Sequence, residues 1–165
     1  MLEQCDLPEG IISLGTGAFT QCYELKTTKL PNALQTIGMG AFQGDSKITI
    51  AEIPKSVKTI GSSAFSYCAG ITISKFGGSE HSLKEIHKDA FKEAGSQVIT
   101  VQIGSSVEVI GPTAFSGYGG NKLTSVTFAK SGAYDYFKDA DRLNRHEIPS
   151  DMGFSGVSVE WNIDI

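Results

Sequence analysis

The sequence has little of what builds metal centres, disulfide frameworks or membrane spans. Only three of its 165 residues are cysteine, and no Cys-x-x-Cys or His-x-x-x-His pair offers the paired ligands of a structural zinc site. No apolar run approaches the roughly 20 residues that a helix needs to cross a bilayer. We therefore expect neither a zinc site nor direct membrane insertion by these residues.

Charge is also scarce, and it lacks a basic cluster. Fourteen Lys and Arg residues are set against 18 Asp and Glu residues, which gives a formal net charge of −4. Nucleic-acid binding needs a clustered basic footprint that neutralises phosphates. The densest basic group, Arg142, Arg145 and His146, is scattered. The sequence predicts that nucleic acid is not a partner.

Signatures of catalysis and of cofactor binding are missing as well. The sequence contains no Gly-x-Ser-x-Gly nucleophile elbow, no Gly-x-x-x-x-Gly-Lys-Ser/Thr loop and no Gly-x-Gly-x-x-Gly turn. His81, Glu85, His87 and Asp89 lie close in sequence, but around a turn they would point in different directions. We expect a protein that is not an enzyme and that holds neither a cofactor nor a metal ion.

What the sequence does have is a repeat built around Ala-Phe pairs. The clearest copy, residues 57–65, reads Val-Lys-Thr-Ile-Gly-Ser-Ser-Ala-Phe. Other copies keep two apolar positions, usually a glycine, and the Ala-Phe pair. A period of 20–50 residues indicates a solenoid or another repeat array. The repeat phenylalanines, separated by 23, 23, 26 and 24 residues, are Phe19, Phe42, Phe65, Phe91 and Phe115.

A second motif precedes the Ala-Phe units and reads apolar-x-x-apolar-x-apolar. Two copies are Ile48-x-x-Ala51-x-Ile53 and Ile71-x-x-Ser74-x-Phe76. The last two apolar positions alternate, which is typical of a strand. Stacked copies would place equivalent strands roughly 4.8 Å apart over a continuous apolar core. The sequence predicts a mostly β solenoid of about five repeats, each of 23–26 residues, in residues 1–129.

Two of the cysteines occupy the same place in the repeat. Cys22 and Cys68 each follow a repeat phenylalanine by three residues. Two coils would separate them by roughly 9.6 Å, more than the ~7 Å limit on the Cα separation of a disulfide. We expect small buried residues rather than a disulfide.

The two ends of the chain are less regular. Residues 131–145 carry apolar residues at helical spacing, and alternation from Val157 to Ile165 predicts a strand. Residues 130–165 are either a C-terminal cap over the last repeat or the start of a following module, and we favour the cap. The chain starts inside a repeat, without a polar cap or a signal peptide. We therefore expect a fragment of a longer protein.

The repeat resembles a known family. The pattern Pro-x-Ser-Val-x-x-Ile-Gly-x-x-Ala-Phe at residues 54–65, followed by Cys68, is similar to the BspA-like leucine-rich repeats. The resemblance covers roughly residues 2–129. It implies a right-handed superhelix of the α/β type with little helix. It also implies a secreted or surface protein that adheres to host proteins such as fibronectin or fibrinogen.

The expected function is that of a non-catalytic interaction module whose partner is a protein, such as an extracellular-matrix protein, or a glycan. The alternative is a structural spacer or stalk that displays another domain. If the solenoid binds a partner, an exposed sheet face is the usual surface. In the repeat template, two residues of each strand point outward, and an adjacent pair of outward isoleucines would be a modest sign of an interface. The candidate binding residues are Lys29, Ile50, Glu52, Ile73, Lys75, Thr100 and Gln102.

Overall fold

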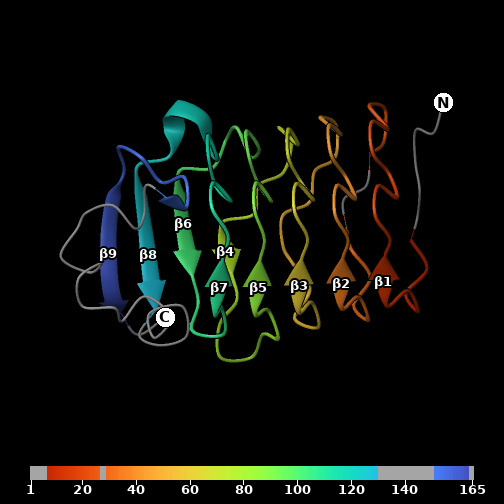
Figure 1. Ribbon diagram of the computed structural model, residues 1–165, viewed down its shortest axis with the longest axis horizontal. Coiled ribbons are helices and arrows are strands. Elements are labelled where there is room, and N and C mark those ends of the chain that lie inside the picture. Colours follow the sequence, from red (N-terminus) through yellow and green to blue (C-terminus); the bar gives the residue numbers. More distant parts are fainter. Residues whose placement is uncertain (1–6, 27–28, 130–150, 164–165) are drawn as a thin grey trace.

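The computed structural model describes residues 7–26, 29–129 and 151–163. Its coils stack along the long axis of the molecule, with β1 (Ser13–Leu14) at one end and β9 (Ser158–Ile163) at the other (Figure 1). Each coil contributes to a sheet on one side, turns through the Ala-Phe segment, and returns along a second side. The predicted mostly β solenoid is therefore confirmed, and the structure adds that its strands pair in parallel.

The first sheet consists of short parallel strands, one from each coil. In each strand the second residue is buried, and it lies in register with its equivalents in neighbouring coils. The strands, in sheet order, are β1 (Ser13–Leu14), β2 (Thr36–Ile37), β3 (Thr59–Ile60), β5 (Glu85–Ile86) and β7 (Val109–Ile110). The inward residues form an apolar ladder of Leu14, Ile37, Ile60, Ile86 and Ile110.

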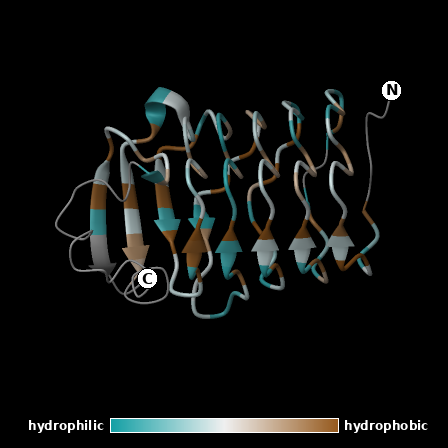
Figure 2. Ribbon diagram, in the orientation of Figure 1, coloured by the Kyte–Doolittle hydropathy of each residue, from teal (hydrophilic) through white to brown (hydrophobic). Residues whose placement is uncertain are grey.

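The second sheet is also parallel, and its strands point in the opposite direction to those of the first (Figure 1). Hydrophobic and hydrophilic residues alternate along β6, so one of its faces points to the core and the other to solvent (Figure 2). The 3-10 helix η1 (Gly120–Lys122) precedes the third strand. In sheet order the strands are β4 (Lys75–Phe76), β6 (Thr100–Ile103), β8 (Ser125–Ala129) and β9 (Ser158–Ile163).

The strand predicted near the C-terminus is present as β9, which pairs in parallel with β8. The helical spacing predicted for residues 131–145 lies outside the described residues. Just before β9, the Phe154 ring stacks on Phe115 at 4.7 Å and adds a sixth ring to the phenylalanine ladder. Residues 151–160 thus pack directly on the last coil. The assignment of residues 130–165 as a C-terminal cap rather than the start of a following module stays a prediction.

The Ala-Phe segments are held by hydrogen bonds both within a coil and between coils. In the third coil, the Phe65 N–H donates to the Ala90 carbonyl at 2.8 Å, and Phe42 bonds to Ala64 in the same way. His87 takes the place of the glycine in the fourth segment, and close stacking at the equivalent positions requires Gly38, Gly61 and Gly111. A Cβ on Gly61 would lie 2.7 Å from the backbone nitrogen of Met39 in the preceding coil, a separation that side chains do not tolerate.

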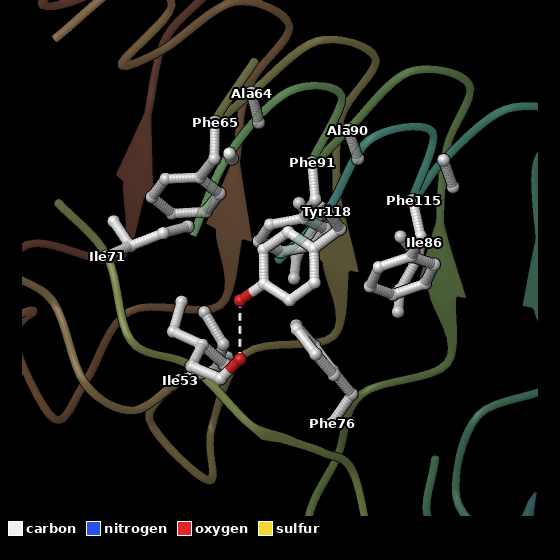
Figure 3. Close-up of a cluster of buried hydrophobic side chains, with 14 of the residues drawn as sticks. Ile53, Ala64, Phe65, Ile71, Phe76, Ile86, Ala90, Phe91, Phe115 and Tyr118 are labelled. Atoms are coloured by element: carbon white, nitrogen blue, oxygen red, sulfur yellow. Dashed lines mark hydrogen bonds between the residues drawn. The ribbon is translucent and has the colours of Figure 1, made fainter. Parts of the chain in front are cut away.

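The core is a column of aromatic rings flanked by aliphatic ladders. Successive repeat phenylalanines from Phe19 to Phe115 stack with centroids 5.2–5.4 Å apart. Phe76 and Tyr118 meet this column edge-on near Phe91 and Phe115 (Figure 3). Each buried phenylalanine contributes about 1.5–3 kcal/mol by removing apolar area from water. The described interior is filled by side chains, so the surface is where a partner can bind.

Candidate binding face

The outward face of the second sheet carries a continuous row of polar side chains. Lys75 on β4 pairs in register with Gln102 on β6. Gln102 pairs with Thr127 on β8, and Thr127 pairs with Glu160 on β9. We call Lys75, Gln102, Thr127 and Glu160 the outward row. It starts at a cation and ends at a carboxylate, and both terminal side chains are exposed.

A parallel row of hydroxyls lies beside the outward row. Thr100, Ser125 and Ser158 are register partners on β6, β8 and β9. The predicted residues Thr100, Gln102 and Lys75 therefore share one face. Sequence reasoning missed Glu160, because it did not extend the template to the strand beyond residue 130.

Two of the predicted residues do not belong to this face. Ile50 and Ile73 were expected to point outward, but both side chains are 0% exposed. Ala51 and Ser74, which the template placed in the core, are exposed instead. The prediction of an outward isoleucine pair is therefore wrong.

The reason lies in the backbone of these two coils. In β6 and β8 the buried residues alternate, as in Val101 and Ile103. Residues 48–53 form no strand, and their buried positions are Ile48, Ile50 and Ile53. The buried residues are therefore separated first by two positions and then by three. Such a spacing suits an extended chain that forms no regular strand, because a polyproline II conformation has three residues per turn. The sequence does carry a signal of this difference. The motif position that holds Val101 in the later coil holds Ala51 in the earlier one, and the large apolar residue Ile50 stands one position before it.

Lys29 and Glu52 lie on the surface but outside the outward row. Lys29 forms an exposed ion pair with Glu9 at 3.5 Å. Among the described residues, it forms no ion pair with Glu52, another residue of the candidate set. Exposed pairs of this kind contribute about 0–1 kcal/mol.

The turn after β4 adds charge beside the start of the outward row. Glu80 forms an ion pair with Lys55 in the preceding coil. Partial burial and the charges of Lys55 and Lys75 lower the pKa of His81, against the opposing effect of Glu80 and Glu52. A lowered pKa favours the neutral form of His81 at neutral pH, so Lys75 is the cation at this end of the outward row.

The other titratable groups near this turn do not converge. His87 Nε2 lies 3.1 Å from Glu85 Oε2 on the surface of the first sheet. Within the described part of the chain, no three His, Cys, Asp or Glu side chains are grouped so that they could hold a metal ion. Among the same residues, no helix has the length and apolarity of a bilayer span. What the face offers chemically is hydrogen bonds and two opposite charges.

Comparisons with known proteins agree with this architecture. The model of the BspA type leucine rich repeat region matches residues 1–122, in six copies. A leucine-rich repeat protein from Bacteroides ovatus ATCC 8483, solved as a crystal structure, is similar in fold, with a TM-score of 0.55 and 23% sequence identity. The match covers 75% of this chain and 30% of that one. No curated protein matches the sequence. Because the family model spans most of the chain, this protein belongs to the BspA-type leucine-rich repeat family.

Proposed function

We propose that this chain is a non-catalytic interaction module of a secreted or cell-surface protein, and that it adheres to host or neighbouring-cell proteins through the outward row. Membership in a leucine-rich repeat family supports a role in protein binding. The observation that carries the proposal is the outward row, which runs in register across four strands. The residue that follows each of the first three members of the row is buried in the core and anchors the strand there; these residues are Phe76, Ile103 and Phe128.

Rigidity is what makes this row suitable for binding. The backbone positions of Lys75, Gln102, Thr127 and Glu160 are set by the sheet before any partner arrives. Less conformational freedom is then lost on association, which favours affinity. Solenoid proteins commonly use extended faces of this kind for partners.

The charges of the row suggest the chemistry of the partner. Lys75 and Glu160 stand three strands apart, a separation of roughly 14 Å at the usual strand spacing. Amide and hydroxyl groups lie between them. A protein segment in extended form, with an acidic side chain near Lys75 and a basic one near Glu160, would match this pattern. An extracellular-matrix protein is the partner class that we propose.

A binding screen tests the proposal. The protein is passed over immobilised fibronectin, fibrinogen and collagen, and affinity is read by biolayer interferometry. We expect Lys75→Glu to weaken the captured interaction at least tenfold. Lys88→Glu is the matched control, because Lys88 is exposed but follows a strand of the first sheet. Equal losses in both variants would contradict the outward row as the site.

The alternative, a spacer that displays another domain, is favoured by the ties between coils. Ion pairs join neighbouring coils at Glu24 and Lys47, at Lys55 and Glu80, and at Lys84 and Glu108. Together with the stacked rings they would make a stiff rod. If the screen finds no partner, the spacer function becomes the better account.

A further inference from the structure

A carboxyl group is buried between the first two coils of the solenoid. The first coil, residues 7–26, carries β1, and the second carries β2 and Asp45. The Asp45 side chain is 0% exposed, and among the described residues neither of its oxygens has a hydrogen-bond partner of ordinary geometry. Lys47, two residues later, forms its ion pair with Glu24 of the first coil instead. A buried carboxylate without a partner is costly, which favours the protonated form.

The repeat indicates which atom Asp45 faces. Cys22, Asp45 and Cys68 occupy equivalent turns, because each N–H donates at 3.1 Å to the carbonyl of the repeat phenylalanine three residues earlier. The Cys68 thiol reaches back by one coil and donates to the Phe42 carbonyl at 2.9 Å. The Asp45 carboxyl lies beside the Cys22 backbone, so it faces the first coil in the same way. By this equivalence the acceptor in front of Asp45 is the carbonyl of Phe19.

Only one protonation state of Asp45 suits this place. A carboxylic acid has an O–H that donates to a carbonyl, as the Cys68 thiol does, whereas an ionised carboxylate offers only acceptor oxygens. Ionised Asp45 would set a negative charge and lone pairs against the Phe19 carbonyl. Burial accordingly raises the pKa of Asp45 to about 7, with a smaller opposing effect from the Cys22 backbone.

The other titratable groups of these coils do not share this behaviour. Cys22 approaches Asp45 with its backbone, and on the third coil burial raises the pKa of the Cys68 thiol to about 12, so that this thiol stays protonated. The remaining titratable or charged side chains nearest to this turn in sequence lie at least partly in solvent, and they are Tyr23, Glu24, Lys26 and Lys47. Asp45 is therefore the buried group whose charge changes near neutral pH at this interface.

The first coil is held less firmly than the coils that follow. Ala18 is exposed and Phe19 is half-buried, whereas their equivalents in the second coil, Ala41 and Phe42, are 0% exposed. Phe19 stacks on Phe42 at 5.4 Å, and its N–H donates to the Ala41 carbonyl at 2.7 Å. Each coil of a solenoid is stabilised by its neighbours. Units with fewer buried apolar contacts open at the low end of the range of local stabilities.

We propose that the first coil opens and closes with pH: protonated Asp45 holds it against the second coil, and ionised Asp45 releases it while the later coils stay folded. In the open state Asp45 meets water and loses its proton at a lower pH than in the closed state. Closure is therefore strongest in acid, weakens as the pH rises, and loses this contribution once the pH passes about 7. Opening presents to solvent one face of the Phe42 ring, which is fully buried in the closed solenoid.

Hydrogen exchange followed by mass spectrometry tests the proposal on the whole chain. Protection factors, corrected for the intrinsic pH dependence of exchange, are measured at pH 5 and pH 7.5. We expect those of residues 12–22 to fall at least tenfold, and at pH 7.5 to lie at least tenfold below those of residues 85–115, because the first coil opens without the rest.

Two variants assign the fall to Asp45. Asp45→Asn supplies a side-chain amide donor that does not titrate, and it should reduce the fall to less than twofold. Glu24→Gln is the matched control, since Glu24 joins the same two coils and the hydrogen bond from Lys47 lowers its pKa. It is ionised throughout this pH range, so the variant should keep the tenfold fall of the parent.

A measurement on the unaltered sequence keeps the test valid if Asp45→Asn does not fold. The 13C shift of the Asp45 carboxyl should titrate with a midpoint of about 7, and a midpoint below 5 would overturn the proposal. An equal fall in the parent and in Asp45→Asn, no fall in the parent, or equal protection of residues 12–22 and 85–115 would each overturn it as well. Lys75→Glu should leave the protection factors unchanged, so this proposal and the outward row succeed or fail independently.

Discussion

The hydroxyl of Tyr118 donates a hydrogen bond to the backbone carbonyl of Ile73, 45 residues earlier in the chain (Figure 3). The ring passes over Gly95 of the intervening coil, where the absence of a side chain leaves room for it. A Cβ on Gly95 would lie 2.7 Å from the Tyr118 ring. Burial raises the pKa of the Tyr118 hydroxyl, so it stays protonated and remains a donor. One side chain thus joins the second sheet of one coil to the turn of a coil two repeats away.

Removing this hydroxyl should destabilise the solenoid. Tyr118→Phe keeps the ring but leaves the buried Ile73 carbonyl without the donor, which should lower the free energy of unfolding by about 1–3 kcal/mol. Tyr67→Phe removes an exposed hydroxyl and serves as the control, with an expected change within about 0.5 kcal/mol. Urea unfolding followed by circular dichroism measures both. Equal stability of the parent and Tyr118→Phe would show that the bond contributes nothing.

The phenylalanine column should respond according to position. Phe65 is fully buried and stacks on Phe42 at 5.3 Å and on Phe91 at 5.2 Å. Phe65→Ala should therefore cost about 3–5 kcal/mol. Phe19 is only partly buried and stacks on Phe42 alone among the described rings, so Phe19→Ala should cost less. The ranking, read from urea midpoints, would be contradicted if Phe19→Ala were the more damaging change.

Asp45 should make the fold less stable as the pH rises. Its side chain is buried, lies three residues after Phe42, and has no hydrogen-bond partner of ordinary geometry for either carboxylate oxygen. Burial raises the pKa of Asp45 from 3.8 to about 7, and the Cys22 backbone opposes this only in part. The thiol of Cys68, whose pKa burial raises to about 12, occupies the next coil and bonds to the Phe42 carbonyl at 2.9 Å.

The sign follows from which state binds the proton. Between about pH 4 and pH 7 the unfolded chain ionises Asp45 while the folded chain keeps it protonated, so stability falls by up to about 1.4 kcal/mol per pH unit. The stability that protonated Asp45 contributes is fully present below the unfolded pKa of its carboxyl, and it is lost once the pH passes the folded pKa. Asp45→Asn removes the charge, and its stability relative to the parent should increase from pH 4 to pH 8. A constant difference between the two proteins across this range would refute the prediction.

Ile73 and Ser74 offer a direct test of the corrected face. Ile73→Lys places a charge in a fully buried position and should destabilise the protein by at least about 3 kcal/mol. Ser74→Lys changes an exposed neighbour and should alter stability by no more than about 0.5 kcal/mol. The repeat template predicts the reverse order. Thermal unfolding of the two variants decides between the two assignments.

The repeat itself could be predicted because its spacing reflects stacking. The phenylalanine column, the inward isoleucines and strand β9 all follow from positions that recur or alternate. The position three residues after each repeat phenylalanine is also equivalent from coil to coil. Applying this rule to every coil would have placed Asp45 and Tyr118 in the same ladder as Cys22 and Cys68. The sequence reading assigned only the two cysteines to this ladder, so it missed the buried carboxylate.

The exposed face was harder to predict, because one template was applied to coils with different backbones. Ile50 and Val101 both meet the core, although they stand at different places in the motif. Whether consecutive buried residues are two or three positions apart in this motif depends on pairing with the strands of neighbouring coils.

The most direct measurement is a map of the residues that a captured matrix protein segment contacts. The protein, labelled with 15N and 13C, would be titrated with that segment and followed by NMR chemical shifts of backbone and side chains. We predict that the largest changes fall on Lys75, Gln102, Thr127 and Glu160, with smaller changes on Thr100 and Ser125. Changes gathered instead on the first sheet, or spread evenly over the coils, would contradict the outward row as the binding surface.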